Sequence, residues 1–227
     1  MIGPLAVLWE DAQGLAVDKP AGLLTQGAGD AEPTLEGLVR HHLRPEAPGS
    51  IYLGTVHRLD RPVSGVVLWA KTPKAARRWA GQFASREVRK VYWAIVEGDA
   101  TSLGGSGSWE DHLARPDASG RAEVVEAGRP GSAPASTAYI VEGGEGLPAG
   151  FARLALRPST GRTHQLRAQA AARGLPIVGD ATYGSARPFR RGIALHARSL
   201  TVIHPSRRVS MTIEAPLPPS WEEWLGG

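Results

Sequence analysis

The chain has 227 residues, no cysteine and a formal net charge of +4. This length suits one large domain or two small ones, with a core that needs neither disulfides nor metals. The absence of cysteine excludes disulfides, thiolate nucleophiles and thiolate zinc sites. No apolar run reaches membrane-spanning length, and no basic segment precedes an apolar one at the N-terminus, so we expect a cytoplasmic protein without membrane association.

The predicted strands begin as a hairpin and continue as a spaced series. In chain order they span residues 5–9, 14–17, 66–70, 88–96, 109–114, 121–125, 135–141, 151–156, 193–203 and 209–213. Gly, Pro and Ser turns separate them, which is typical of an antiparallel sheet with few crossover helices. We therefore expect an α+β fold.

Helices are predicted where a capping residue precedes a periodic segment. They span residues 35–43 after Thr34, residues 73–85 after Thr72, residues 164–173 after Thr163, and a short terminal helix or turn at 221–225.

Positive charge is concentrated in the C-terminal half. Residues 151–210 contain eleven arginines and one acidic residue, Asp180. The whole chain has four lysines, so its cationic surface is almost entirely guanidinium. Guanidinium groups stack on bases and pair with phosphates, which suits a nucleic-acid partner. A GC-rich genome explains arginine in place of lysine, but it does not explain why residues 151–210 contain only one acid.

One stretch before the apolar run at residues 66–70 places a carboxylate among cations. Residues 55–65 read Thr-Val-His-Arg-Leu-Asp-Arg-Pro-Val-Ser-Gly, with His57, Arg58 and Arg61 around Asp60. Nearby positive charges keep a carboxylate ionised, as a nucleophile or a cation ligand requires. A surface turn capped by Asp60 is the alternative, and this stretch alone slightly favours it.

This stretch, which runs on to Ala-Lys at residues 70–71, resembles the signature of pseudouridine synthases of the RluA type. Three further segments resemble the same family in the same order. They are VDKPAGL at 17–23, KVYWA at 90–94, and GRTHQLRA at 161–168 continuing through GLPIVGD at 174–180 to Tyr183 and Gly184. Motifs that occur together in one order argue against chance. One departure is Val63, where the family usually has threonine.

The resemblance implies a fold and an activity. The fold is a single α+β catalytic domain over residues 1–227, with a largely antiparallel bisected β-sheet, flanking helices and an active cleft across its middle. No separate S4-like RNA-binding domain is expected, because the first motif begins near Leu15. The activity is isomerisation of specific uridines in rRNA or tRNA to pseudouridine, with no cofactor and no metal. The expected partner is an RNA stem-loop, and the expected state is a monomer without an obligate protein partner.

The resemblance also implies a catalytic set. Asp60 is its essential aspartate, and Arg167 is the arginine paired with that aspartate. Tyr92 is an active-site tyrosine whose ring can stack on the uracil and whose hydroxyl can move a proton. A phosphate contact for Arg167 and an ordinary strand aromatic for Tyr92 are the alternatives. Asp180 and Tyr183 are expected to stabilise the last motif rather than to react.

Five residues are assigned to substrate binding. A uridine inside folded RNA must be flipped out, at a cost of a few kcal/mol, and Arg58 matches the arginine that fills the gap in relatives. Arg61 and Arg162 are expected to contact phosphates, with a solvated rim charge as the alternative. His57 either holds the turn or meets a phosphate. Leu195 packs either against the uracil or in the protein core.

Three other functions fit parts of the sequence. A retaining glycosidase needs a second carboxyl about 5–5.5 Å from the first, and the matched motifs offer only Asp180. A hydrolase based on Ser64, His57 and Asp60 lacks the Gly-x-Ser-x-Gly elbow. A catalytically silent RNA-binding or ribosome-assembly factor of the same fold is the third, and the presence of the whole implied catalytic set argues against it.

Overall fold

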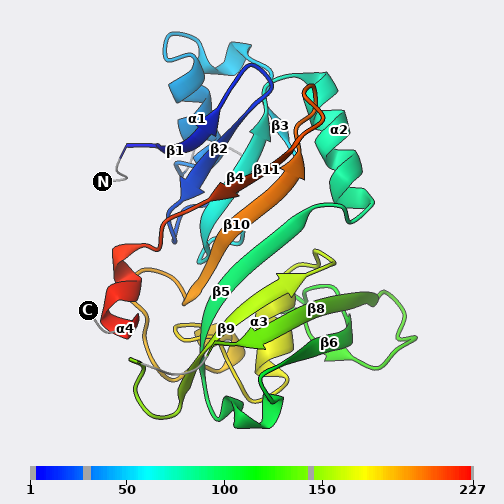
Figure 1. The fold of residues 1–227 in the computed structure, drawn as a ribbon, viewed down its shortest axis with the longest axis vertical. Coiled ribbons are helices and arrows are strands. Elements are labelled where there is room, and N and C mark those ends of the chain that lie inside the picture. Colours follow the sequence, from blue (N-terminus) through cyan, green and yellow to red (C-terminus); the bar gives the residue numbers. More distant parts are fainter. Residues whose placement is uncertain (1–3, 28–31, 143–145, 226–227) are drawn as a thin grey trace. The chain divides into compact units, whose positions relative to one another are not determined.

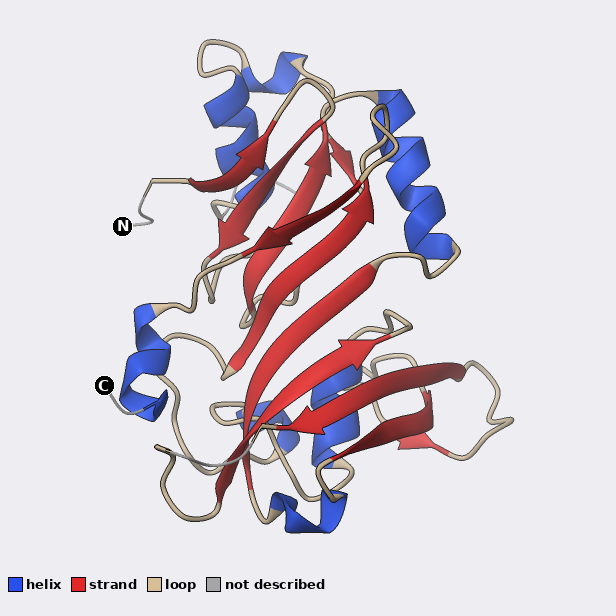
Figure 2. Cartoon of the chain, in the orientation of Figure 1, coloured by secondary structure: helices blue, strands red, loops and turns tan. Residues whose placement is uncertain are grey.

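The structure is a computed structural model that describes residues 4–27, 32–142 and 146–225 (Figure 1). The chain forms two compact units, each discontinuous in sequence. Unit 1 takes its described residues from 1–89 and 197–217, and unit 2 from 90–196 and 218–227. Both units combine helices with mostly antiparallel strands (Figure 2), which confirms the predicted α+β class. The single catalytic domain over residues 1–227 stays a prediction.

Unit 1 is built on a sheet that begins with the expected N-terminal hairpin. Its strands follow the order β1 (Ala6–Glu10), β2 (Gly14–Lys19), β4 (Ser64–Ala70) and β10 (Leu195–Ile203), with β3 (Gly54–Thr55) paired to β4 and β11 (Ser210–Glu214) paired to β10. The pairs β1–β2, β2–β4, β3–β4 and β10–β11 are antiparallel. Every residue of β4 is buried, as its unbroken apolar run predicted.

The two longer helices of unit 1 begin at the predicted caps. In α1 (Leu35–Leu43) the Thr34 hydroxyl accepts a hydrogen bond from Gly37 N, and in α2 (Pro73–Ala84) the Thr72 hydroxyl accepts one from Ala75 N. These bonds satisfy amide groups that have no partner within the helix. Helix α2 packs on the sheet through Ala75 and Trp79, which join a core cluster with alternate residues of β4. A short 3₁₀ helix, η1 (Pro48–Ser50), follows α1.

Unit 2 contains a five-stranded antiparallel sheet. Its order is β5 (Arg89–Glu97), β9 (Phe151–Pro158), β8 (Ala133–Val141), β6 (Ser106–Leu113) and β7 (Val124–Val125). Strand β7 is shorter than the predicted 121–125, because Ala122 N donates to the Tyr183 hydroxyl at 2.9 Å instead of joining the ladder.

Helix α3 (Gln165–Ala171) packs on unit 2's sheet through Ala168 and through Gln169, whose amide bonds to Thr137 and Asp111. The predicted Thr163 cap and His164 start are wrong. His164 precedes the helix with a left-handed φ of 55° and makes no side-chain cap. Instead, the side chain of Gln165 binds the backbone of the turn before the helix. Its Oε1 accepts a hydrogen bond from Arg162 N at 3.0 Å.

The remaining elements of unit 2 are short. They are η2 (Ala100–Leu103), η3 (Ala181–Tyr183), η4 (Pro219–Trp221) and α4 (Glu222–Leu225). None of the helices in the described parts of the chain has the length and apolar character to cross a membrane.

Candidate active site

Asp60 lies in unit 1, in the loop between β3 and β4, with its side chain half-buried. Val63 N donates to Asp60 O at 3.1 Å and closes a tight turn. On the other side, the Thr25 hydroxyl donates to Leu59 O at 2.7 Å and accepts from Leu59 N at 3.3 Å. The loop that carries Asp60 is therefore fastened to the segment that follows β2.

The strand after this turn requires glycine at position 65. Gly65 has a φ of +116°, and a Cβ there would lie 2.3 Å from Ala197 O of β10. An L side chain fits neither the backbone conformation nor the space. The glycine thus lets β4 and β10 approach closely just after the Asp60 turn.

A fully buried lysine is attached to the same turn. The Lys19 ammonium donates to the carbonyl oxygens of Pro20 at 3.1 Å, Leu23 at 2.7 Å and Arg61 at 3.1 Å. These three acceptors match the three donors of an ammonium. The sequence analysis gave Lys19 no role. The sequence feature that could have indicated a role for Lys19 is its position in the first motif, between a buried strand and a proline.

Burial and charge act in opposite directions on Lys19 and its neighbour. Burial lowers the pKa of Lys19 to about 7, while the carboxylates of Asp60 and Asp18 raise this pKa and Arg61 lowers it further. Burial raises the pKa of Asp18 to about 6, against the opposing effect of the Lys19 charge. The Lys19 and Asp60 charges therefore attract each other across the turn.

The other predicted residues of unit 1 lie on the Asp60 loop. Arg61 donates through Nε to Gly22 O at 3.0 Å, and its Nη2 lies 3.2 Å from Glu32 Oε2. His57 Nε2 accepts from Leu68 N at 2.9 Å, and its ring stacks on Phe83 with centroids 5.0 Å apart. These contacts fit the alternative in which His57 holds the turn. Arg58 is exposed.

Arg167 lies in unit 2, on α3, and is 4% exposed. Its Nε donates to Asp180 Oδ2 at 2.6 Å and its Nη2 donates to Asp180 Oδ1 at 2.9 Å, a bidentate pair. Its guanidinium also lies 4.9 Å from the ring centroid of Tyr183, whose hydroxyl donates to Ala122 O. Asp180 and Tyr183 thus hold Arg167 in place, in keeping with the stabilising roles expected of them. The sequence analysis missed that Asp180 holds Arg167, although Asp180 is the one acid among eleven arginines in residues 151–210.

The remaining predicted residues are also in unit 2. Tyr92 is half-buried on β5, opposite Leu156 of β9. Arg162 is exposed, and its Nε donates to Pro134 O at 3.1 Å. Leu195 begins β10 and is buried, which fits the core-packing alternative.

Lys90 is a second lysine that the sequence analysis did not use. It begins the Lys-x-Tyr-x-Ala motif, and its Nζ donates to Thr160 O at 2.9 Å, two residues before Arg162. Burial lowers the pKa of Lys90 to about 8. Its hydrogen bond holds the turn that leads into α3.

The candidate residues thus form two groups, one in each unit. The group of unit 1 is Lys19, His57, Arg58, Asp60 and Arg61, and the group of unit 2 is Lys90, Tyr92, Arg162, Arg167, Asp180 and Leu195. The first offers an anchored carboxylate, and the second offers an aromatic hydroxyl and a buried, fixed guanidinium. Such a set suits acid–base or nucleophilic chemistry on a polyanionic substrate.

The chain is similar in sequence to known proteins over most of its length. Residues 13–172 match the family described as RNA pseudouridylate synthase. The dual-specificity RNA pseudouridine synthase RluA of Escherichia coli K12 is 36% identical over 93% of this chain and 93% of its own. An uncharacterized RNA pseudouridine synthase of Zymomonas mobilis is 35% identical over 96% of this chain and 95% of its own. The ribosomal large subunit pseudouridine synthase D of Xylella fastidiosa is 36% identical over 95% of this chain and 66% of its own.

Solved structures agree with these sequence matches. Human RNA pseudouridylate synthase domain containing 1 superposes with a TM-score of 0.74 at 29% identity, over 94% of this chain and 84% of its own. The fold and the sequence matches are those of an RNA-modifying isomerase. The chain belongs to the RNA pseudouridylate synthase family, and within it to the RluA type. It is a pseudouridine synthase that acts on RNA.

Proposed function

We propose that Asp60 is the essential catalytic carboxylate of this pseudouridine synthase, assisted by Tyr92 and Arg167. The observation that carries this assignment is the anchoring of the Asp60 turn. Lys19, with no exposed surface, donates to Arg61 O, and its charge attracts Asp60. A turn whose backbone is held on both sides, next to a cation, suits a carboxylate that has to react. The surface-turn alternative for Asp60 does not call for a buried ammonium.

The reaction breaks the bond between uridine N1 and C1′ and forms one between C5 and C1′. The proton on C5 leaves and a proton appears on N1, so the product is an isomer of the substrate and no oxidant or phosphate donor is consumed. The Asp60 carboxylate can assist by attacking C1′, by attacking the ring, or by promoting elimination across C1′ and C2′. Each route requires an ionised Asp60 at the junction of sugar and base.

The partners of Asp60 have distinct tasks in this proposal. Tyr92 stacks its ring on the detached uracil, and its hydroxyl takes part in moving the C5 proton. Arg167 serves as the cationic partner of Asp60 in the reaction, and Asp180 holds its guanidinium in place. The burial of Arg167 supports a role as partner of a carboxylate rather than a contact with an RNA phosphate.

The substrate is proposed to be a stem-loop in rRNA or tRNA. Relatives named for the ribosomal large subunit and a relative named as dual-specificity support RNA targets of this kind. The exposed Arg58 fills the gap left by the flipped uridine, and Arg61 and Arg162 contact phosphates. The uracil contact expected for Leu195 is not part of this proposal, because its side chain is buried in the protein core. The monomeric state and the cytoplasmic location also remain predictions.

The decisive experiment maps pseudouridine at nucleotide resolution in total RNA from cells with and without this gene. Sites that disappear with the gene identify the substrate. We expect the wild-type gene to restore them and Asp60→Asn to leave them unmodified. Purified protein incubated with transcribed rRNA and tRNA fragments tests the same variant in isolation.

A matched control is Asp117→Asn. Asp117 is another aspartate on a turn, where its carboxylate accepts from Ser119 N and Arg121 N. It belongs to neither group of candidate residues, so this variant should restore every site. Restoration by Asp60→Asn as well would show that the carboxylate is dispensable and would overturn the assignment.

A further inference from the structure

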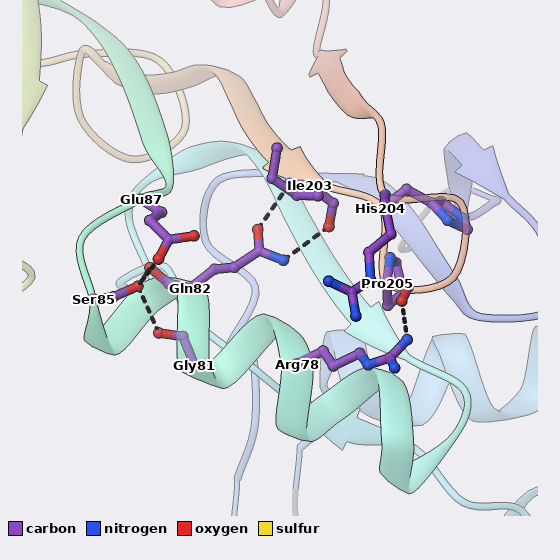
Figure 3. A pocket seen from close by; sticks show the side chains of 9 residues that line it. Arg78, Gly81, Gln82, Ser85, Glu87, Ile203, His204 and Pro205 are labelled. Carbon is purple, nitrogen blue, oxygen red and sulfur yellow. Dashed lines mark hydrogen bonds between the residues drawn. The ribbon is translucent and has the colours of Figure 1, made fainter.

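Unit 1 contains a groove that none of the candidate active-site residues lines. It has a volume of about 430 Å³ and lies between α2 and the turn that joins β10 to β11 (Figure 3). Its lining residues are Arg78, Gly81, Gln82, Ser85, Glu87, Ile203, His204, Pro205 and Arg208.

The walls of the groove are fixed to each other. The Gln82 side chain accepts from Ile203 N at 2.8 Å and donates to Ile203 O at 2.9 Å, as Figure 3 shows. Arg78 donates to Pro205 O, and Trp79 Nε1 donates to Ile203 O at 3.2 Å. The opposite wall is held by His204, whose Nε2 lies 2.8 Å from Asp11 Oδ2. The groove is therefore preorganised rather than formed by loose side chains.

The charge of the groove is positive. Arg78 and Arg208 line it, and Arg86 lies between two lining residues, Ser85 and Glu87. Glu87 is the one carboxylate among the lining residues, and it already accepts from the Ser85 hydroxyl at 2.7 Å. The guanidinium groups thus outnumber the opposing charge.

Two of these arginines occupy backbone positions that favour glycine. Arg86, just past the end of α2, has a φ of 62°, and Arg208, in the turn, has a φ of 60°. A left-handed backbone is unfavourable for L side chains and free of strain for glycine, which is the usual residue after a helix end. Among the described residues, thirteen glycines have a positive φ, and the four other residues that do are Arg86, His164, Arg191 and Arg208. Strained positions of this kind often serve function.

We propose that this groove is a second RNA contact, in which Arg86 and Arg208 bind phosphates of the substrate backbone. The inference rests on the RNA substrate of the proposed function and extends it to a surface separate from the reacting residues. The walls of the groove are fixed to each other, and guanidinium groups match phosphate oxygens in geometry and charge. Contacts of this kind position the RNA without reading its sequence.

The test is the double variant Arg86→Gly/Arg208→Gly. Because glycine suits both backbone positions, this variant should fold with an unchanged or higher Tm, which separates binding from stability. The matched control is Arg44→Gln/Arg191→Gly, which removes the same charge from two exposed arginines outside the groove, one of them also left-handed with a φ of 63°. The probe is a transcribed stem-loop that carries the mapped uridine.

We expect the groove variant to bind this RNA roughly tenfold more weakly and to reduce the log–log salt slope by about one for each arginine lost. Its kcat at saturating RNA should remain that of the wild type, with KM raised. Wild-type affinity and slope in the groove variant would overturn the proposal. An equal loss in the control would overturn it too, because net charge alone would then explain the effect. Asp60→Asn serves as a separate arm, since it should bind with wild-type affinity and fail only in turnover.

Discussion

At the scale of single residues, the bidentate pair of Arg167 and Asp180 is the most buried ionic contact of the candidate site. Removing one member of a buried pair leaves an uncompensated charge, which costs on the order of 3–5 kcal/mol. We therefore expect Arg167→Ala to lower the free energy of unfolding by about that amount and to abolish turnover. Urea unfolding and pseudouridine formation measure the two effects. An inactive variant of full stability would contradict the burial of this pair.

Tyr92 can act through its ring, its hydroxyl or both, and Tyr92→Phe separates these roles. The phenyl ring keeps the stacking surface and loses the proton. We expect RNA affinity close to that of the wild type and turnover that is largely lost. Binding assays and single-turnover kinetics at saturating RNA provide the comparison. Full turnover in this variant would leave stacking as the only task of Tyr92.

Lys19 predicts a pH dependence of stability. Its pKa is lowered from 10.5 to about 7 by burial, so between these pH values the unfolded chain binds a proton that the native protein does not. The contribution of this group to stability therefore rises with pH in that range, at no more than about 1.4 kcal/mol per pH unit. The difference in unfolding free energy between wild type and Lys19→Met should shift in favour of the wild type from pH 7 to pH 10. A difference that does not vary with pH would mean that Lys19 stays protonated throughout.

Much of the residue-level site could be predicted from the motifs, and the remainder could not for physical reasons. Asp60, Tyr92 and Arg167 stand in segments whose residue types already suggest chemistry. Lys19 was missed because lysine is rarely buried without a partner, and its three carbonyl partners become neighbours only when the loops after β2 and before β4 meet. The spacing of residues along the chain does not show that these two loops lie together.

At the scale of elements, Gly65 controls the start of β4. In Gly65→Ala the new methyl group would meet Ala197 O at 2.3 Å on a left-handed backbone, so the Asp60 turn or β10 must move. We expect a variant with clearly lower Tm and little activity. The control is Gly81→Ala on the exposed side of α2, where nothing lies within 4 Å of the added carbon. Alanine there should raise the unfolding free energy by about 0.5–1 kcal/mol. The Tm values of both variants, measured by thermal unfolding, test these two expectations.

The boundaries of helices and strands agree with the sequence predictions where residues close in sequence determine them. The threonine caps of α1 and α2 were predictable because a cap acts within four residues. The start of α3 and the length of β7 were not, because distant partners decide them. The Gln165 side chain before α3 is held by Ser136 O and the Thr137 hydroxyl, to which its Nε2 donates hydrogen bonds. The hydroxyl of Tyr183 accepts a hydrogen bond from Ala122 N.

At the scale of the whole molecule, the excess of arginine predicts a salt-dependent affinity for RNA. Each phosphate neutralised releases counterions, so log Kd should change with log salt by roughly 0.7–0.9 per phosphate contacted. Titration of a substrate stem-loop between low and physiological salt measures the slope. An affinity that is independent of salt would contradict an arginine-based RNA surface. The division into two units, in contrast, could not be predicted, because no linker composition marks it.

The interleaved order of the two units has a consequence for synthesis. Unit 1 needs β10 and β11 beside β4, while unit 2 needs the terminal segment in which Trp221 is fully buried, with its ring 6.0 Å from that of Phe189. Because β10 and β11 follow most of unit 2 in the sequence, unit 1 cannot be completed before most of unit 2 has been synthesised. Folding of one domain after another in chain order, which is common in larger proteins, is therefore not open to unit 1.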